Sequence, residues 1–262
     1  MLNRYDEVCD PGYSFGGGSS GGAGHFTQVV WSGSKELGIG MATGKKGSMT
    51  CTYIVGRYRP AGNMGGEYKK NVPKGKFTQD VCKKTEQMAK DIDESVGKEG
   101  AKDEPADGAK AASDDAGSKL GDSESEKPND DASGGGGAGG GADGNSFQQG
   151  GLKAHNKFRD IHGTSAMKLN KEMNDMAEAY AKKLAQQGSL QHASASERKN
   201  DGENLAYSCS SKPGASYTGA GATRNWYVYV IMFLADSTEC LKMYVISTKK
   251  RLQTFSNHCI AT

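Results

Sequence analysis

The second half of the chain contains two stretches in which apolar residues recur every three or four positions. One runs from Leu169 to Leu184 and is followed by Gly188, a residue type that commonly ends helices. The other covers residues 147–163 and also ends at a glycine. This period predicts two helices, each with one face buried against a core. The methionine and tyrosine side chains of the first stretch are expected to belong to that core.

The first quarter of the chain has a different period. Leu37, Ile39 and Met41 alternate with glycines, which is the period of a strand. Residues 43–47 contain two glycines and predict a turn, and residues 50–58 are again rich in β-forming side chains. A hairpin in one region and helices in another indicate the α+β fold class.

Between these regions lies a long stretch of low sequence complexity. Residues 93–141 contain almost no apolar side chain larger than alanine, so they cannot bury enough surface to offset the entropy lost on ordering. Residues 134–141 are glycine at all positions but one and are expected to be flexible. Residues 77–92 are expected to form at most a short polar helix. The chain is therefore predicted to consist of two folded regions joined by a disordered linker.

Charge is unevenly distributed along the chain. Residues 91–143 hold fifteen acidic residues and five lysines, a net charge of −10, which leaves +12 for the rest because the whole chain carries +2. A basic folded part favours an acidic partner such as an anionic membrane surface, although solubility alone explains it equally well. No apolar run is long enough to span a bilayer. Residues 1–4 lack the apolar core of a signal peptide.

Three short motifs combine polar residues with apolar residues that must be buried. Residues 24–34 read GHFTQVVWSGS, residues 53–63 read YIVGRYRPAGN, and His192 precedes Glu203 of a GENL motif by eleven positions. On residue types alone, His25 of the first motif would more simply mark the end of a helix or strand. Together the motifs resemble the signature motifs of the CAP superfamily, which comprises cysteine-rich secretory, antigen-5 and plant pathogenesis-related proteins. The similarity is greatest to the Golgi-associated pathogenesis-related branch.

The order of these motifs is reversed relative to the family. The C-terminal half of such a domain occupies residues 1–75, and the N-terminal half occupies residues 148–227. An acidic linker at residues 76–147 separates the halves, and residues 228–262 match no motif. The resemblance implies an α-β-α sandwich. We expect the halves to dock into one circularly permuted domain, either within a chain or by exchange of halves in a homodimer.

The resemblance also implies a His-Glu-Glu-His cluster. The second half would supply His192 and Glu203, and the first half would supply Glu7 and His25. Two imidazoles that face one cleft can bind Zn²⁺ or another divalent cation through their neutral nitrogens, and two protein ligands would hold the ion weakly. If the domain were a hydrolase, Glu7 or Glu203 would be the catalytic base.

The resemblance favours a non-enzymatic binding module that associates with lipid or sterol and with anionic membrane surfaces. It implies an extracellular or Golgi and membrane-associated location, and nucleic acid is not an expected partner. The alternatives are a metal-dependent hydrolase that uses the same cleft, and a secreted defence or venom-type effector. Nothing in the sequence resembles a Ser-His-Asp triad or a phosphate-binding loop.

The remaining histidines and the six cysteines change this interpretation little. His155 is expected to pack or to form a hydrogen bond, and His162 to cap carbonyl groups at the end of its helix. His258 lies in residues 228–262, which match no motif, and the sequence gives it no expected role. The cysteines lack the paired spacing of a zinc finger. Gly56 stands where secreted relatives carry a cysteine, which argues against their usual disulfide framework.

Overall fold

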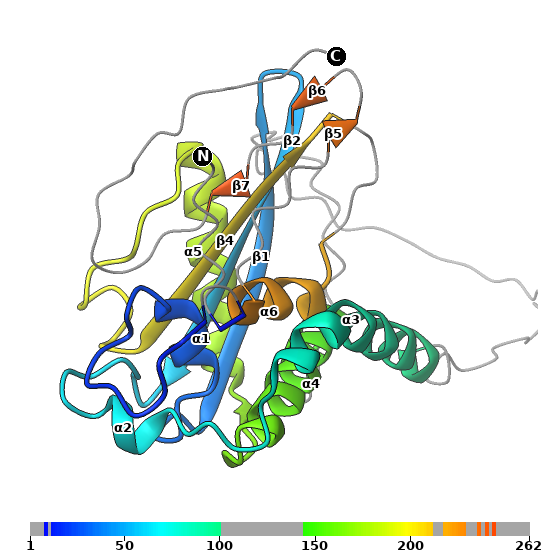
Figure 1. Ribbon diagram of the computed structural model, residues 1–262. Helices are drawn as coiled ribbons and strands as arrows, with labels where there is room; N and C mark the ends of the chain where they lie inside the picture. Colours follow the sequence, from blue (N-terminus) through cyan, green and yellow to red (C-terminus); the bar gives the residue numbers. More distant parts are fainter. Residues whose placement is uncertain are drawn as a thin grey trace, which may run out of the picture.

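The computed structural model (Figure 1) describes residues 8–9, 12–100, 144–211 and 217–228, and the backbone of three short strands further on. The helices are α1 (Gly24–Val29), α2 (Tyr68–Asn71), α3 (Gln79–Gly100), α4 (Ser146–Ile161), α5 (Lys171–Gln187) and α6 (Gly219–Val228). The strands are β1 (Glu36–Lys46), β2 (Met49–Arg59), β3 (Lys168–Leu169), β4 (Gly202–Ser210), β5 (Ala235–Asp236), β6 (Glu239–Cys240) and β7 (Met243–Tyr244).

The two long helices of the second region begin and end where local chemistry favours it. Asn145 caps α4 and forms a capping box with Gln148, whose backbone N–H donates to the Asn145 side chain. Asn170 caps α5 in the same way through the N–H of Met173. Gly188 ends α5 in the left-handed conformation at φ 63°. Both predicted helices are therefore confirmed.

One sheet joins the two regions of the chain. Its strand order is β3-β1-β2-β4-β7. The predicted hairpin of β1 and β2 is confirmed, but its turn lies at residues 47–48, because strand pairing continues to Lys46 and Met49. β2 pairs with β4 in antiparallel fashion from Thr50 opposite Ser210 to Tyr58 opposite Gly202. The first and second regions thus contribute adjacent strands, as expected if the halves dock.

Helices cover both faces of this sheet, and side chains of β2 alternate between them. Tyr53 and Val55 pack with α5 residues such as Ala177 and Leu184. Ile54 belongs instead to the core built with α1, α4 and α6. The helices of this second face lie side by side in Figure 1, with α3 outermost along α4 and α6. The structure is thus a mixed α/β fold in which the sheet is the middle layer.

The glycines of β1 allow α5 to lie very close to the sheet. A Cβ atom on Gly38 would lie 2.3 Å from the carbonyl carbon of Met173, and one on Gly40 would lie 2.3 Å from the backbone nitrogen of Glu178. Ile39, between them, is fully buried on the opposite face. The alternation that predicted a strand therefore also reflects a helix packed directly on its backbone.

Helix α3 corrects the predicted linker. Residues 76–147 were expected to be linker and residues 93–141 disordered, with no helix beyond residue 92, yet α3 runs to Gly100. Thr85, Ala89 and Val96 recur at helical spacing and are buried. The prediction from composition missed this stripe because the charged outer face of the helix dominates the average. Residues 101–143 lie outside the described residues.

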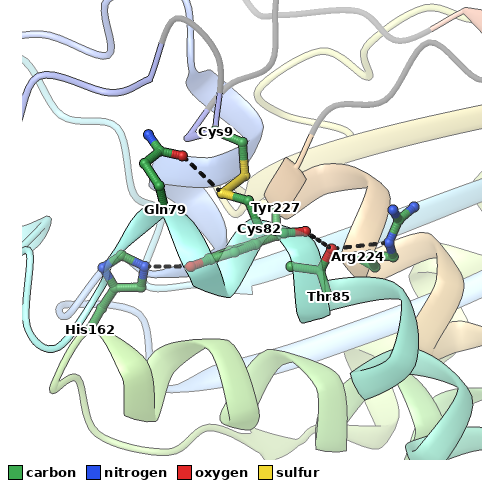
Figure 2. The surroundings of a disulfide bond; sticks show 7 residues. All are labelled: Cys9, Gln79, Cys82, Thr85, His162, Arg224 and Tyr227. Carbon is green, nitrogen blue, oxygen red and sulfur yellow. Dashed lines mark hydrogen bonds between the residues drawn. A yellow bond between two sulfur atoms is a disulfide. The ribbon is translucent and has the colours of Figure 1, made fainter.

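Two disulfide bonds cross-link the described part of the chain. Cys51 of β2 is bonded to Cys209 of β4, and Cys9 is bonded to Cys82 of α3 (Figure 2). The absence of a cysteine at position 56 argued only against the framework of secreted relatives, and it did not reveal these two pairs. Disulfides are typical of proteins from oxidising compartments.

Candidate functional site

His192 and Glu203 meet at the start of β4, on the side of the sheet that α5 covers. The chain leaves α5 at Gly188, passes His192 in the following loop and enters β4 one residue before Glu203. The His192 Nδ1 atom lies 2.6 Å from Glu203 Oε1, and the backbone N–H of Ala193 donates to the same oxygen at 3.0 Å. The Glu203 side chain is fully buried, whereas 21% of the His192 side chain is exposed.

Arg57 holds the other oxygen of this carboxylate. It stands opposite Glu203 in the β2–β4 register, and its Nη1 atom lies 2.7 Å from Glu203 Oε2. The contact is an ion pair without hydrogen-bond geometry at either atom. The guanidinium carbon lies 5.0 Å from the centre of the Tyr180 ring. Burial lowers the pKa of Arg57, while the negative charge of Glu203 opposes this shift.

This arrangement determines the chemistry of His192. The Glu203 carboxylate can only accept at the contact with Nδ1, so we place the imidazole proton on Nδ1. The lone pair then resides on Nε2, which is the tautomer that suits a metal ligand oriented by a carboxylate. Because both oxygens of Glu203 are engaged and its side chain is buried, Glu203 acts as an orienting group and is poorly placed to serve as a general base.

His25 comes from the other region and lies in α1. It is buried, and its backbone carbonyl accepts a hydrogen bond of 3.1 Å from the Asn204 side chain, next to Glu203 in β4. Asn63, at the end of the second motif, donates to the carbonyl of Gly24 at 2.8 Å. All three motifs thus meet at the same end of the sheet.

The metal ligand set remains incomplete in the described part of the chain. No group of three or more His, Cys, Asp or Glu side chains placed to hold a metal ion occurs among these residues. Glu7, the fourth member of the expected cluster, lies outside them. The oriented imidazole of His192 fits the role of a single ligand to Zn²⁺, which usually takes three or four.

Two further histidines are buried on the other face of the sheet. His155 Nε2 lies 2.9 Å from the Tyr58 hydroxyl and its Nδ1 lies 2.7 Å from the carbonyl of Gly151, so the expected hydrogen bonding is confirmed. His162 caps its own helix as expected, through its backbone N–H, which donates to the carbonyls of Phe158 and Arg159, but its side chain bonds elsewhere. Its Nδ1 lies 2.9 Å from the carbonyl oxygen of Pro73. Its Nε2 lies 2.8 Å from the hydroxyl of Tyr227 (Figure 2). Tertiary packing supplies these partners of the side chain, which come from segments distant in sequence.

Arg159 is a structural residue whose role the sequence did not reveal. Its buried guanidinium donates to the carbonyl oxygens of Val29, Trp31 and Ser34 at 3.1, 2.9 and 3.0 Å. Burial lowers its pKa to about 10. It attaches α4 to the segment that follows His25 and so helps to hold α1 in place. The apolar period of residues 147–163 puts position 159 on the buried side of the helix, and this is the signal that the sequence offers.

Comparison with known proteins assigns part of this fold to a family. Residues 152–253 match the family model described as CAP, the cysteine-rich secretory protein family. The chain carries a CAP domain at these residues. Salivary antigen-5 of Dipetalogaster maximus is 44% identical over 63 residues, which cover 24% of this chain and 24% of that protein. Golgi-associated plant pathogenesis-related protein 1 of Homo sapiens is 41% identical over 78 residues, or 29% of this chain and 46% of that protein. Venom allergen 5 of Vespa velutina is 39% identical over 62 residues, or 24% of this chain and 31% of that protein.

These matches cover the CAP relatives only in part. The chain spans less than half the length of each of the three, with shares of 24%, 46% and 31%. The family match includes residues 228–253, where the motifs had ended, but not the motifs at residues 24–34 and 53–63. No solved structure matches the chain. Among the described residues, none of the helices has the length and apolar character needed to cross a membrane.

Proposed function

We propose that this chain is a non-enzymatic CAP-type binding module with a weak divalent-cation site at His192 and His25, and that it associates with lipid or sterol at anionic membrane surfaces. The observation that carries the proposal is the chain of contacts from Arg57 through Glu203 to His192. In this chain of contacts, a buried ion pair between Arg57 and Glu203 orients the single imidazole of His192. Such an arrangement suits a residue that binds a ligand.

The burial of Glu203 also favours binding over hydrolysis. A general base needs a lone pair within reach of the proton it removes. The oxygens of Glu203 already face His192, Ala193 and Arg57. A hydrolase would therefore have to use another base, and Glu7 is the other candidate from the sequence. A bound divalent cation would supply Lewis acidity, while the protein residues would hold and orient it.

A basic surface supports the membrane part of the proposal. Exposed lysines cluster in sequence around α2 and the loop that follows it, at positions 69, 70, 74 and 76. Met64, just before them, is the most exposed large apolar residue of the described part of the chain, with 56% of its surface accessible. Lysines near an anionic bilayer contribute about 1 kcal/mol each, and a neighbouring apolar side chain can enter the headgroup region.

The pairing of β2 with β4 supports a circularly permuted CAP domain. In this interpretation the motifs at residues 24–34 and 53–63 supply the strands and the α1 helix that the matched region lacks. The two disulfides and the names of the salivary, venom and Golgi-associated relatives support an extracellular or Golgi location.

Calorimetric titration with Zn²⁺ tests the cation site. The intact chain is expected to bind one ion weakly, and both His25→Ala and His192→Ala should abolish that binding. His162→Ala is the matched control, because it removes a histidine outside the cluster and should leave the binding isotherm unchanged. Circular dichroism confirms that each variant is folded. Binding that persists in both test variants would refute the site.

Flotation with liposomes tests the membrane surface. A variant with Lys69, Lys70, Lys74 and Lys76 changed to Gln should lose binding to phosphatidylserine vesicles. The control variant removes the same amount of charge elsewhere, at the exposed residues Lys45, Lys46, Lys157 and Lys168. It should keep most of the binding to phosphatidylserine vesicles. Binding of the intact chain should weaken as salt is raised. Equal binding to neutral and anionic vesicles would contradict the electrostatic part of the proposal.

A further inference from the structure

The domain is assembled from two segments that are not continuous in sequence. We call residues 8–100 the first segment and residues 144–228 the second segment. The β2–β4 ladder runs between them over nine paired positions, from Thr50–Ser210 to Tyr58–Gly202. Helix α5 of the second segment packs on β1 and β2 of the first segment. The candidate site also draws on both, because Arg57 belongs to the first segment and His192 and Glu203 belong to the second.

One disulfide spans these segments. Cys51 and Cys209 are directly opposite each other, one pair inside the end of the ladder, with a Cα–Cα distance of 3.9 Å. They are separated by 158 positions in the sequence. Both are buried, at 0% and 3% exposure, in the apolar cluster beneath α5. A reductant can therefore reach the bond only when this end of the sheet opens.

The other disulfide lies within the first segment. Cys9 and Cys82 are both partly exposed, and their bond attaches the start of the described chain to α3 (Figure 2). Thr85, one turn further along α3, accepts from Arg224 of α6 at 3.3 Å, so α3 keeps a contact with the second segment that does not depend on this bond. The two disulfides differ in both accessibility and position, so each serves as a control for the other.

We infer that the Cys51–Cys209 disulfide keeps the two segments joined even when the chain between residues 100 and 144 is cut. The protein would then persist as a disulfide-linked two-chain molecule. Thiol–disulfide exchange at this bond then governs whether the second segment can leave. A dithiol reductant attacks one sulfur to form a mixed disulfide, and its second thiol completes the exchange. The protein gains two thiols and the reductant becomes a cyclic disulfide.

The buried position of Cys51–Cys209 predicts an order of reduction. The partly exposed Cys9–Cys82 bond opens first, because access of the thiolate limits the rate of exchange. This step leaves the segments covalently joined. Reduction of Cys51–Cys209 follows and converts their association from a tethered into a bimolecular equilibrium in the cleaved molecule. Loss of the second segment dismantles the Arg57–Glu203–His192 cluster, whatever ligand that cluster binds.

The test uses the full chain with a protease recognition sequence inserted after Gly121, in a background with Cys240→Ser and Cys259→Ser. After cleavage, we expect one species of undiminished mass in denaturant without reductant, and two fragments after dithiothreitol is added. Cys9→Ser/Cys82→Ser should behave in the same way. Cys51→Ser/Cys209→Ser should give two fragments in denaturant without reductant.

A second measurement does not depend on the serine variants folding. In the cleaved protein, the urea midpoint should be independent of protein concentration before reduction and dependent on it afterwards. Alkylation at graded dithiothreitol concentrations, followed by mass spectrometry, should label Cys9 and Cys82 before Cys51 and Cys209. Fragments that separate in denaturant without reductant, or a midpoint that depends on concentration before reduction, would overturn the inference.

Discussion

Two histidine environments lie on opposite faces of the same two strands. Arg57 and Glu203 point towards α5, where Glu203 contacts both Arg57 and His192. The next residues, Tyr58 and Asn204, point the other way, where Tyr58 contacts His155 and accepts a hydrogen bond from Asn204. The first cluster contains buried charges and reaches the surface through His192. The second contains only neutral hydrogen-bond partners and is closed. A buried ion pair adds little net stability, so its presence beside a partly exposed histidine indicates function more than structure.

Breaking the ion pair should have the largest effect on stability. Arg57→Met leaves the Glu203 carboxylate buried without a cation, which should lower the free energy of unfolding by about 3–5 kcal/mol. Urea denaturation measures the loss. The double variant Arg57→Met/Glu203→Gln removes both charges and should recover much of that stability. If the double variant is less stable than Arg57→Met, the pair is not the source of the effect.

The next largest effect on stability should come from acid, through the second cluster, which contains His155. Burial lowers the pKa of His155 from 6.5 to about 3, with a smaller contribution from the charge of Arg159. Above pH 6.5 the histidine is neutral in both states, and stability is at its maximum. Below pH 6.5 the unfolded chain takes up a proton that the folded protein does not accept until about pH 3, so stability falls as the pH falls. At pH 5, protonation of His155 in the unfolded chain should lower the free energy of unfolding by about 2 kcal/mol.

The histidine contribution can be separated from other acid effects. His162 is also buried, with its pKa lowered to about 4, and should add to the same decline. In His155→Gln the slope of unfolding free energy against pH between pH 6.5 and 5 should be about half that of the unmodified chain. Denaturation at several pH values provides the measurement. An unchanged slope would show that His155 does not titrate on unfolding.

Removing one hydroxyl should weaken the neutral network by a smaller amount. The Tyr58 hydroxyl meets His155 Nε2 at 2.9 Å and accepts from Asn204 at 3.1 Å. Tyr58→Phe leaves both partners buried without this contact, at a cost of about 1–2 kcal/mol. Thermal unfolding measures the loss. Zn²⁺ titration should be unaffected, and a coincident loss of cation binding would contradict the separation of the two clusters.

The smallest effect on stability is expected at His192. In His192→Ala, Glu203 retains the ion pair with Arg57 and the hydrogen bond from the Ala193 N–H. The free energy of unfolding should therefore change by less than about 1 kcal/mol. The same variant should lose cation binding under our proposal. A large loss of stability measured by urea denaturation would indicate that His192 is a structural residue like His155.

The sequence alone identified His192 and Glu203, which contact each other, and His25, whose backbone carbonyl accepts from the neighbouring Asn204, because all three residues occur in motifs that can be recognised locally. It did not identify Arg57 as their partner. Strand periodicity places Arg57 and Tyr58 on opposite faces, but which face meets α5 depends on how β2 pairs with β4. That register joins residues from distant segments, and no local window contains the contacts that select it.

The same distinction applies to the whole fold. The sequence by itself determined the elements whose patterns are local: the amphipathic α4 and α5, the glycine that ends α5, and the β1–β2 hairpin. Only the tertiary structure decided that α3 packs against α4 and α6 despite its charged composition, and that Cys51 meets Cys209. Burial and cross-linking depend on which surfaces come together, and the free energy of those contacts belongs to pairs of distant segments rather than to either one.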